Sequence, residues 1–342
     1  MTIDGADGGG QLLRTALSLA TVFDIPFRIE DIRGSRPTPG LKAQHLTAVD
    51  VVSELCDAEV TGAELGSDAL TFRPGDARRT SLRADIGTAG SVTLLFDTVL
   101  PIGAVADRPV ELTATGGTNV KWAPTVEYHQ LVKRPLLADW GVSADIGLER
   151  TGFYPAGGGE ATLRTYPSSP SPVELDTRGA LERVEIYSKA SEDLADRDVA
   201  DRQAEHADAE LEDAEFPTEI RGVEYVPARS TGSSLLLRGV YEDTLVGVDA
   251  LGERGRTSEA VAEGAVREFT AFHATGASVD AYMADQVVPF LALAGGRVRI
   301  PARTDHVRTN LDLVARFGSD CHLDRGVDGT LTLAASVPPS RK

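Results

Sequence analysis

The chain has 342 residues, with 34 Lys and Arg against 52 Asp and Glu, so its formal net charge is −18 at pH 7. Apolar residues make up 42% and charged residues 25%, which excludes a disordered chain and predicts about two folded domains. No apolar run approaches ~20 residues, so a membrane span is not expected. Residues 1–11 have no basic start and no apolar core, and the absence of a signal-peptide pattern predicts a cytoplasmic protein.

The basic residues are unusual in kind, because only five of the 34 are Lys and 29 are Arg. Abundant Asp with scarce Lys favours a salt-adapted, halophilic protein over an ordinary acidic one. The charge argues against non-specific binding to nucleic acid, but it permits a local phosphate-binding cleft lined by Arg. Cys56 and Cys321 are too few for a disulfide framework or a zinc ribbon.

Helices and short strands are expected to alternate through the first half of the chain, because apolar residues recur there at helical and strand spacings. The predicted helices cover residues 12–23, 41–56, 88–99 and 124–138. The predicted strands cover residues 26–32, 57–61, 69–73, 81–86 and 109–115. Strand–helix units joined by short loops indicate layers of sheet and helix.

The composition changes near residue 184. Residues 191–215 hold eleven acidic residues and two Arg, which is typical of a helix face turned to solvent. Strands predicted over 184–188, 219–226, 233–240 and 244–250 make this segment a separate small α/β unit. The first domain is then expected to resume with helices over 258–275, 280–294 and 305–317, strands over 297–300 and 330–334, and a loose tail over 338–342.

A glycine loop, Asp7-Gly-Gly-Gly-Gln11, opens the first helix, and Arg14 follows within its first turns. Unpaired N–H groups at such a helix start bind anions, and Asp7 is a candidate ligand for a divalent cation. The loop has no GK[ST] ending and no strand is expected before it, so it is neither a Walker loop nor a Rossmann fingerprint. A tight turn with a surface Arg is the alternative interpretation.

A second set of candidates surrounds the next helix start. Arg33 and Arg36 share one loop, and their planar guanidinium groups match phosphate oxygens. Gln44 and His45 follow on the helix, where His45 lies on the apolar side and is either a core residue or a catalyst. The segment 87–91 (Gly-Thr-Ala-Gly-Ser) is another helix start, either an oxyanion nest or an ordinary cap.

The C-terminal candidates are Tyr282, Asp285 and Gln286, on a helix that Pro289 is expected to kink, and His306 in the first turn of a later helix. A helix N-terminus disfavours a cationic His, so the ring of His306 is expected to keep the free lone pair that a nucleophile toward phosphorus needs. A surface His after a cap is the alternative. Metal-site and hydrolase motifs such as HExxH and GxSxG are absent, so the residues point to phosphoryl or nucleotidyl chemistry without naming a reaction.

Taken in order, these segments resemble the RNA 3′-terminal phosphate cyclase family. The resemblance rests on Asp4-Gly5, Gly8 to Arg14, Arg33 to Leu41, Gln44 to Val49, Ile86 to Ser91, Thr98 to Pro101, Gly116 to Thr118, Gly152 to Gly159, Tyr282 to Gln286, and His306. It implies an α/β (α+β) fold: a large domain of repeated βαβαββ-type units over 1–183 and 276–342, similar to enolpyruvyl transferases, with a small α/β domain inserted over 184–275.

The resemblance also implies an activity. In such cyclases a His attacks the α-phosphorus of ATP and becomes adenylylated, AMP passes to an RNA 3′-phosphate, and the 2′-hydroxyl closes a 2′,3′-cyclic phosphate. By this resemblance His306 is the nucleophile. Arg14, Arg36 and His45 then join it as catalytic residues, and Arg33, Gln44, Asp97, Tyr282, Asp285 and Gln286 bind ATP or phosphate. Asp7 is the implied ligand for Mg²⁺ or Mn²⁺, in a glycine loop two residues shorter than usual and in place of a Glu, and Asp97 replaces a commoner Gln.

Two other functions fit the same residues less well. Non-catalytic relatives act as RNA-binding factors in ribosome assembly, but they lack the nucleophilic His that is present here as His306. Enolpyruvyl transferases use characteristic Lys residues, which have no counterpart in this Lys-poor chain. An ATP-dependent enzyme acting on RNA with a 3′-phosphate end is therefore the favoured interpretation.

Overall fold

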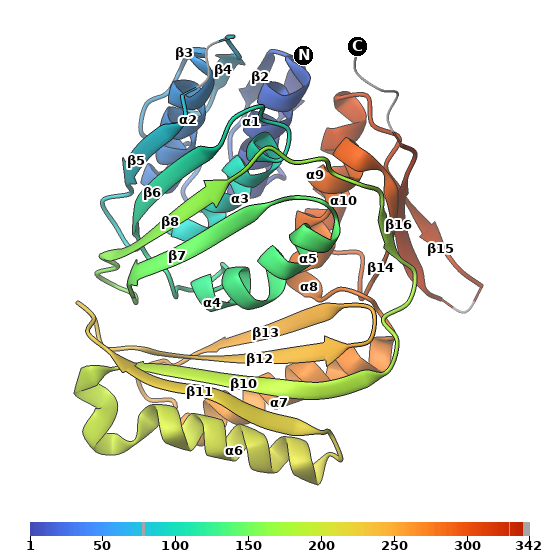
Figure 1. The fold of residues 1–342 in the computed structure, drawn as a ribbon. Coiled ribbons are helices and arrows are strands. Elements are labelled where there is room, and N and C mark those ends of the chain that lie inside the picture. Colours follow the sequence, from blue (N-terminus) through green and yellow to red (C-terminus); the bar gives the residue numbers. More distant parts are fainter. Residues whose placement is uncertain (77–78, 328, 338–342) are drawn as a thin grey trace.

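Three four-stranded sheets share one topology in the computed structural model, which describes residues 1–76, 79–327 and 329–337 (Figure 1). Their strand orders are β1-β2-β4-β3, β5-β6-β8-β7 and β9-β14-β16-β15. In each sheet the first two strands in the chain pair in parallel, and the last strand pairs antiparallel with the two before it. This arrangement confirms the expected repeated βαβαββ units.

Each unit adds helices to its sheet. The first consists of β1 (Thr2–Asp4), α1 (Gly10–Phe23), β2 (Phe27–Glu30), α2 (Ala43–Cys56), β3 (Glu59–Thr61) and β4 (Leu70–Arg73). The second consists of β5 (Ser81–Asp85), α3 (Val92–Gly103), β6 (Val110–Gly116), α4 (Val126–Tyr128), the π-helix η1 (His129–Lys133), α5 (Arg134–Asp139), β7 (Ala144–Arg150) and β8 (Gly159–Thr165). The third consists of β9 (Val173–Leu175), α8 (Ala281–Gln286), α9 (Val288–Ala294), β14 (Gly296–Ile300), α10 (Asp305–Arg316), β15 (His322–Arg325) and β16 (Leu331–Ala335).

The third unit is interrupted between β9 and α8 by a fourth sheet, which lies apart from the other three in Figure 1. Its segment consists of β10 (Leu181–Ser191), the 3₁₀ helix η2 (Glu192–Arg197), α6 (Val199–Asp213), β11 (Thr218–Val226), β12 (Ser233–Tyr241), β13 (Leu245–Leu251) and α7 (Ser258–Thr275). Helices α6 and α7 cover one face of this sheet and enclose a separate apolar cluster that includes Val184, Leu235 and Phe269. The strand β10 crosses the expected boundary at residue 184, and the two-domain division itself stays a prediction.

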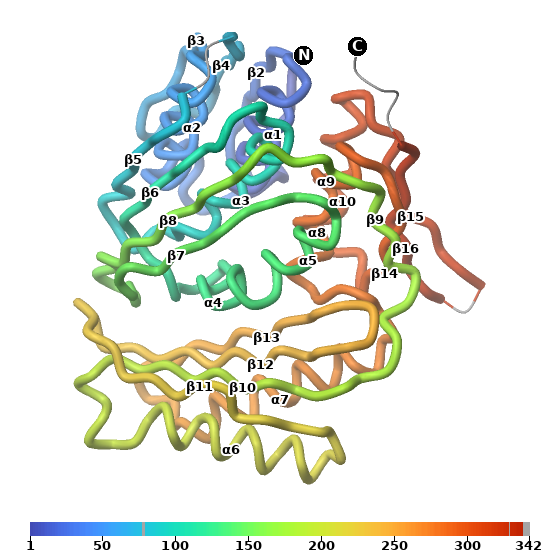
Figure 2. Tube along the Cα trace, in the orientation of Figure 1, coloured from blue at the N-terminus to red at the C-terminus, as the bar shows by residue number. Residues whose placement is uncertain are grey.

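Helix α1 lies at the centre of the repeated units, where it contacts α2, α3 and α10 (Figure 2). Ten of its 14 residues are buried, because apolar and small side chains such as Leu13, Ala16 and Leu17 occupy nearly every side of the helix. The N-terminus of α1, with its glycine loop, lies beside the N-terminus of α10.

Some element boundaries differ from the sequence predictions. Helix α3 begins at Val92 rather than at residue 88, because the Ser91 hydroxyl accepts a hydrogen bond from the Leu94 N–H and caps it. The helix predicted over 124–138 contains the π-turn η1, and the one predicted over 280–294 divides into α8 and α9 next to Pro289. Strands β1, β7, β8, β9 and β15 were not predicted.

The short strand β1 also makes one expectation wrong, since a strand does precede the glycine loop. The tail 338–342 lies outside the described residues. Within the described ranges, none of the helices combines the length and the apolar character that crossing a bilayer requires.

Candidate active site

A pocket of about 570 Å³ opens where the N-terminal ends of α1 and α10 meet α3 and α8. Six of the predicted site residues line it: Arg14, Asp97, Tyr282, Asp285, Gln286 and His306. The side-chain amide of Gln11 donates to the backbone carbonyl of His306 at 3.4 Å and so ties the two helix starts together. The structure therefore brings the C-terminal histidine next to the N-terminal glycine loop.

His306 lies in the first turn of α10, whose N-cap is Thr304. Its Nδ1 lies 3.5 Å from an Asp285 carboxylate oxygen, and 56% of the side chain is exposed to the pocket and solvent. The side-chain amide of Asn310, one turn further along α10, donates to the Asp285 backbone carbonyl at 2.9 Å. Within the described residues Nε2 of His306 has no hydrogen-bond partner, so this ring nitrogen is available to a ligand.

The loop before α1 requires glycine at Gly10 because predicted site residues lie against its backbone. A Cβ atom added at Gly10 would lie 2.0 Å from Nε2 of His45 and 3.1 Å from a guanidinium nitrogen of Arg14. A Cβ atom at Gly9 would lie 3.5 Å from a guanidinium nitrogen of Arg36. Arg14, Arg36 and His45 thus surround the unpaired N–H groups of the α1 N-terminus, which is an arrangement suited to phosphate.

His45 is a neutral hydrogen-bond donor in this arrangement. The backbone N–H of Lys42 donates to its Nδ1 at 3.1 Å, which assigns the ring proton to Nε2, on the side of Gly10. Burial, followed by the nearby charges of Arg14, Arg33 and Lys42, lowers the pKa of His45 to about 3. Its Nε2–H group therefore stays a donor, without charge, throughout the physiological pH range.

Arg14 supplies the positive charge on the pocket wall. Burial lowers the pKa of this guanidinium, while the carboxylates of Asp97 and Asp285 act in the opposite direction. Among the described residues, none forms an ion pair with Arg14. A half-buried cation without a paired carboxylate is attracted to an incoming phosphate.

Two of the predicted phosphate-binding residues are occupied elsewhere. Arg33 donates to the backbone carbonyls of Thr38 and Gly40, both at 2.9 Å, and so holds its own loop together. The side-chain carbonyl of Gln44 accepts a hydrogen bond from the Ser91 N–H at 3.3 Å, which joins α2 to the start of α3. Neither side chain lines the pocket, so both brace the loops around it.

Asp7, the predicted metal ligand, is exposed and accepts a hydrogen bond from the Ser35 hydroxyl at 3.2 Å. In the part of the chain that the structure describes, no group of three or more His, Cys, Asp or Glu residues is placed to hold a metal ion. Asp7 could therefore offer one carboxylate beside the glycine loop. A single carboxylate fits Mg²⁺, which commonly takes one or two carboxylates and completes its coordination with substrate phosphates and water.

Sequence reasoning missed a buried polar network on the far wall of the pocket. The ammonium group of Lys133 donates to Asp97 at 2.6 Å and to the side-chain carbonyl of Gln286 at 2.7 Å. The Nε2 atom of His129 lies 2.7 Å from the same Asp97 oxygen. Burial would raise the pKa of Asp97, but Lys133 and His129 hold it well below its usual range. Asp97 is thus an ionised partner of Lys133, and its second oxygen is buried without a partner among the described residues.

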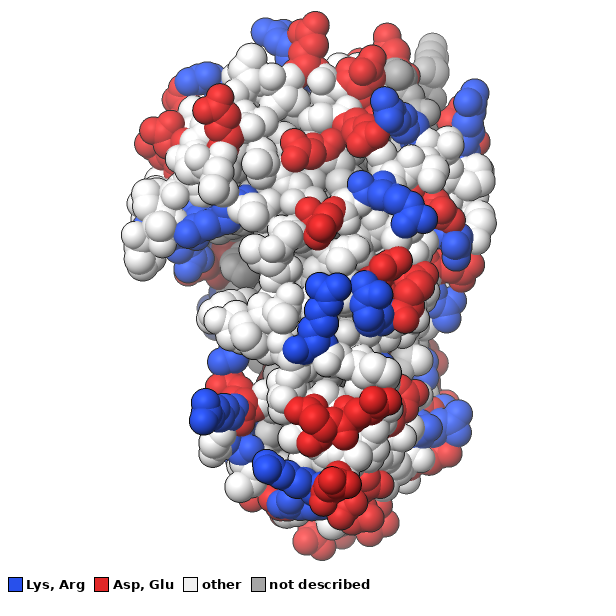
Figure 3. All heavy atoms as spheres, turned by 90° about the vertical axis from the view of Figure 1, so that its left-hand side faces the viewer, with Lys and Arg blue, Asp and Glu red and all other residues white. Residues whose placement is uncertain are grey.

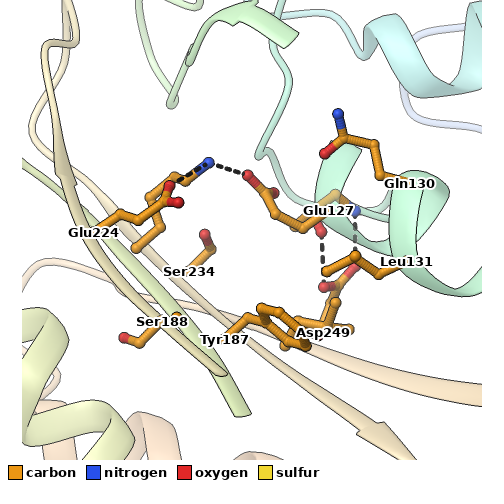
Figure 4. A pocket seen from close by; sticks show the side chains of 12 residues that line it. Glu127, Gln130, Leu131, Tyr187, Ser188, Glu224, Ser234 and Asp249 are labelled. Atoms are coloured by element: carbon orange, nitrogen blue, oxygen red, sulfur yellow. Dashed lines mark hydrogen bonds and ion pairs between the residues drawn. The ribbon is translucent and has the colours of Figure 1, made fainter. Parts of the chain in front are cut away.

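A second cavity, of about 220 Å³, lies between α4 and the inserted sheet (Figure 4). At one end the ammonium group of Lys189 pairs with Glu127 and, at 3.4 Å, with Glu224. At the other end Asp249 accepts hydrogen bonds from the backbone N–H and the hydroxyl of Thr125, at 2.7 and 2.8 Å. Burial, with smaller contributions from Glu127 and Asp280, raises the pKa of Asp249 to about 7. The ion pair of Lys189 with Glu127 and the hydrogen bonds of Asp249 with Thr125 connect the inserted sheet to the repeated units.

Arg14 and His306 share one pocket beside the glycine loop, within an α/β fold of three repeated units. Comparison with known proteins shows the family to which a chain of this kind belongs. A sequence model of the RNA 3′-terminal phosphate cyclase family matches residues 6–320. A protein named RNA 3′-terminal phosphate cyclase from Halobacterium salinarum is 42% identical over 97% of this chain and 99% of its own length. Proteins of the same name from Hyperthermus butylicus and Saccharolobus islandicus are 41% and 38% identical, each over 92% of this chain and 90% and 93% of their own lengths.

The chain therefore belongs to the RNA 3′-terminal phosphate cyclase family. The family assignment agrees with the resemblance stated above and with the three repeated units of the fold.

Proposed function

We propose that this protein converts the 3′-terminal phosphate of an RNA into a 2′,3′-cyclic phosphate at the expense of ATP. The observation that carries the proposal is the shared pocket, in which His306 meets Arg14 and the glycine loop. The names of the relatives support the activity, and the pocket supports a histidine nucleophile. The alternative, a non-catalytic RNA-binding factor, has no need of a histidine whose Nδ1 is held by a carboxylate while Nε2 is open.

In the first step Nε2 of His306 attacks the α-phosphorus of ATP. A P–N bond forms, the bond to the bridging oxygen breaks, and pyrophosphate leaves with the electron pair. Asp285 orients the imidazole through Nδ1 and balances the positive charge that develops on the ring as the bond forms. Arg14, the Nε2–H of His45 and the N–H groups of α1 oppose the charge of the phosphates.

In the second step an oxygen of the RNA 3′-phosphate attacks the phosphorus of the histidine-bound AMP. The P–N bond breaks and an RNA-3′-pp-5′-A anhydride forms. The 2′-hydroxyl then attacks the phosphorus at the 3′ position, loses its proton, and displaces AMP to leave the cyclic phosphate. Arg36, whose guanidinium lies near Gly9, would bind the second phosphate group that these steps require.

The remaining residues bind the nucleotide and support the site. Tyr282 lines the pocket and packs its ring edge-on against Tyr128 at 5.4 Å between centroids, which gives a fixed aromatic surface for a base. Gln286 and Asp97 are held in place by Lys133. Asp7 would hold Mg²⁺ or Mn²⁺ together with phosphate oxygens, and such an ion supplies charge neutralisation when it is bound.

Three further proposals concern the protein as a whole. We propose that residues 1–183 and 276–342 form the catalytic domain and that 184–275 form an inserted domain, as the separate apolar cluster of the fourth sheet supports. We also propose a cytoplasmic location and adaptation to high salt, and the −18 charge with the Lys-poor composition supports the salt adaptation.

The activity is tested with a short RNA that carries a labelled 3′-phosphate, incubated with ATP and Mg²⁺ or Mn²⁺. We expect the label to become resistant to phosphatase and to stay on the RNA, with one AMP released for each end converted. RNA ending in a 3′-hydroxyl is the matched control and should not release AMP. Binding of RNA without conversion in molar as well as low salt would instead support the non-catalytic alternative.

A further inference from the structure

Trp122 stands out among the aromatic residues because 92% of it is exposed, although it lines the same pocket as His306. The chain has only two tryptophans, and the other, Trp140, is 5% exposed. Leaving so large an apolar ring in water forgoes the stabilisation that burial would give. An exposed tryptophan at the rim of a pocket therefore needs an explanation outside the stability of the fold.

The backbone holds Trp122 in this exposed position. Its φ angle is 63°, in the left-handed region that bulky residues rarely adopt. The neighbouring residues Val120 and Ala123 are 5% and 4% exposed, so the turn is anchored on both sides. The strained backbone and the buried neighbours fix the ring outside the core, at the pocket rim.

Basic residues accompany the ring, although the chain as a whole is strongly acidic. The ammonium group of Lys121 lies 3.0 Å from the Glu253 carboxylate, which places the turn after β13 next to this rim. That turn also carries Arg254, whose side chain is exposed, whereas the guanidinium of Arg256 donates to the Ala260 carbonyl on α7 at 2.7 Å. An exposed aromatic ring with basic neighbours is the combination that binds single-stranded nucleic acid, through base stacking and phosphate contacts.

We propose that Trp122 is a stacking platform for an unpaired base of the RNA close to its 3′ end. The proposal rests on the proposed function, because it takes the pocket to be the place where the RNA 3′-phosphate reacts. An RNA base is favoured over the base of ATP because Trp122 is open to solvent at the rim, whereas Tyr282 offers ATP a partly buried ring inside the pocket. Stacking recognises any base, so this contact would add affinity without sequence specificity.

Fluorescence tests the contact directly. The variant Trp140→Phe keeps an aromatic ring against Phe290 and leaves Trp122 as the sole tryptophan. We expect a short single-stranded RNA with a 3′-phosphate to quench this emission in the absence of ATP, and ATP alone to leave it nearly unchanged. Quenching by ATP alone would assign the ring to the nucleotide and overturn the proposal, as would an RNA titration without any quenching.

Affinity provides the second measurement. Trp122→Leu should weaken equilibrium binding of the same RNA by about 5- to 150-fold, and Trp122→Tyr should restore most of the loss. Tyr154→Leu is the matched control, since Tyr154 is also an exposed aromatic residue but does not line the pocket. Equal weakening in both Leu variants would contradict a specific platform. Because RNA binding needs no adenylylation, the quenching should persist in His306→Ala, which separates this proposal from failure of the proposed reaction.

Discussion

Nδ1 of His306 lies 3.5 Å from the carboxylate of Asp285, and the two residues come from different helices, α10 and α8. This contact fixes which ring nitrogen faces the reacting phosphate in the proposed mechanism. We predict that Asp285→Asn lowers the rate of self-adenylylation on the order of 10²-fold, because the ring loses its orientation and its counter-charge. The rate is measured from single-turnover labelling with α-labelled ATP across a range of pH. Asp312→Asn, on the exposed side of α10, is the control, and an equal rate for Asp285→Asn and the wild type would show that the contact is not used.

The glycine loop gives a second prediction. Gly10→Ala places a Cβ only 2.0 Å from Nε2 of His45. Because this distance is far too short, the imidazole must move away from the helix start. Gly9→Ala is the matched control, since its Cβ makes only an ordinary 3.5 Å contact with Arg36. We expect Gly10→Ala to weaken ATP binding at least about tenfold relative to Gly9→Ala, the loss of roughly one charge-assisted hydrogen bond. Similar affinities in the two variants, measured by calorimetry, would mean that His45 does not contact the phosphates.

The third prediction concerns the pH dependence of stability. The folded protein raises the pKa of Asp249 from 3.8 to about 7, so the native state holds this proton more tightly than the unfolded state does. The contribution of Asp249 to the free energy of unfolding therefore falls as the pH rises from about 4 through about 7. Asp249→Asn removes the titration and can still bond to Thr125.

Thermal unfolding at several pH values checks this prediction. Relative to the wild type, the melting temperature of Asp249→Asn should rise from pH 4.5 to about pH 7 and then level off by pH 8. Asp139→Asn, at the exposed end of α5, should follow the wild type at every pH. A constant difference between Asp249→Asn and the wild type would show that Asp249 does not titrate in this range.

Salt gives the fourth prediction. The −18 charge makes the folded state repel itself at low ionic strength, although Figure 3 shows that basic side chains lie among the acidic ones on the face drawn. Since 1 M salt shortens the Debye length to about 3 Å, we expect the melting temperature to rise as KCl is increased from 0.05 to about 2 M. A melting temperature that is flat or falls over this range would contradict salt adaptation.

The sequence predicted the bounds of a helix well where its own residues mark the ends, as an N-cap does. Helix α10 was predicted closely because Thr304 caps it and its apolar residues recur at helical spacing. Strands such as β7 and β8 were missed because their glycines, including Gly147 and Gly159, weaken the local strand pattern, and pairing across the sheet stabilises them instead.

The candidate site likewise contains some residues that the sequence predicted and others that only the structure revealed. Residue type and motif pointed to His306, Arg14 and Asp285, and the structure places all three in one pocket. Lys133 was missed because no local motif marks it, and its contact with Asp97 joins residues 36 apart in the chain. One signal was available, since a Lys retained in so Lys-poor a chain is itself unusual. Arg33 shows the converse, because residue type alone could not reveal that loop carbonyls occupy its guanidinium.

The central claim is that His306 accepts AMP, and covalent labelling tests it most directly. Wild-type protein is incubated with α-labelled ATP and Mg²⁺ or Mn²⁺, denatured, and examined for bound label beside His306→Ala and the control His322→Ala, an exposed histidine on β15. The account predicts acid-labile AMP on the wild type and on His322→Ala, and none on His306→Ala. Equal labelling of all three proteins, or of none, would contradict it.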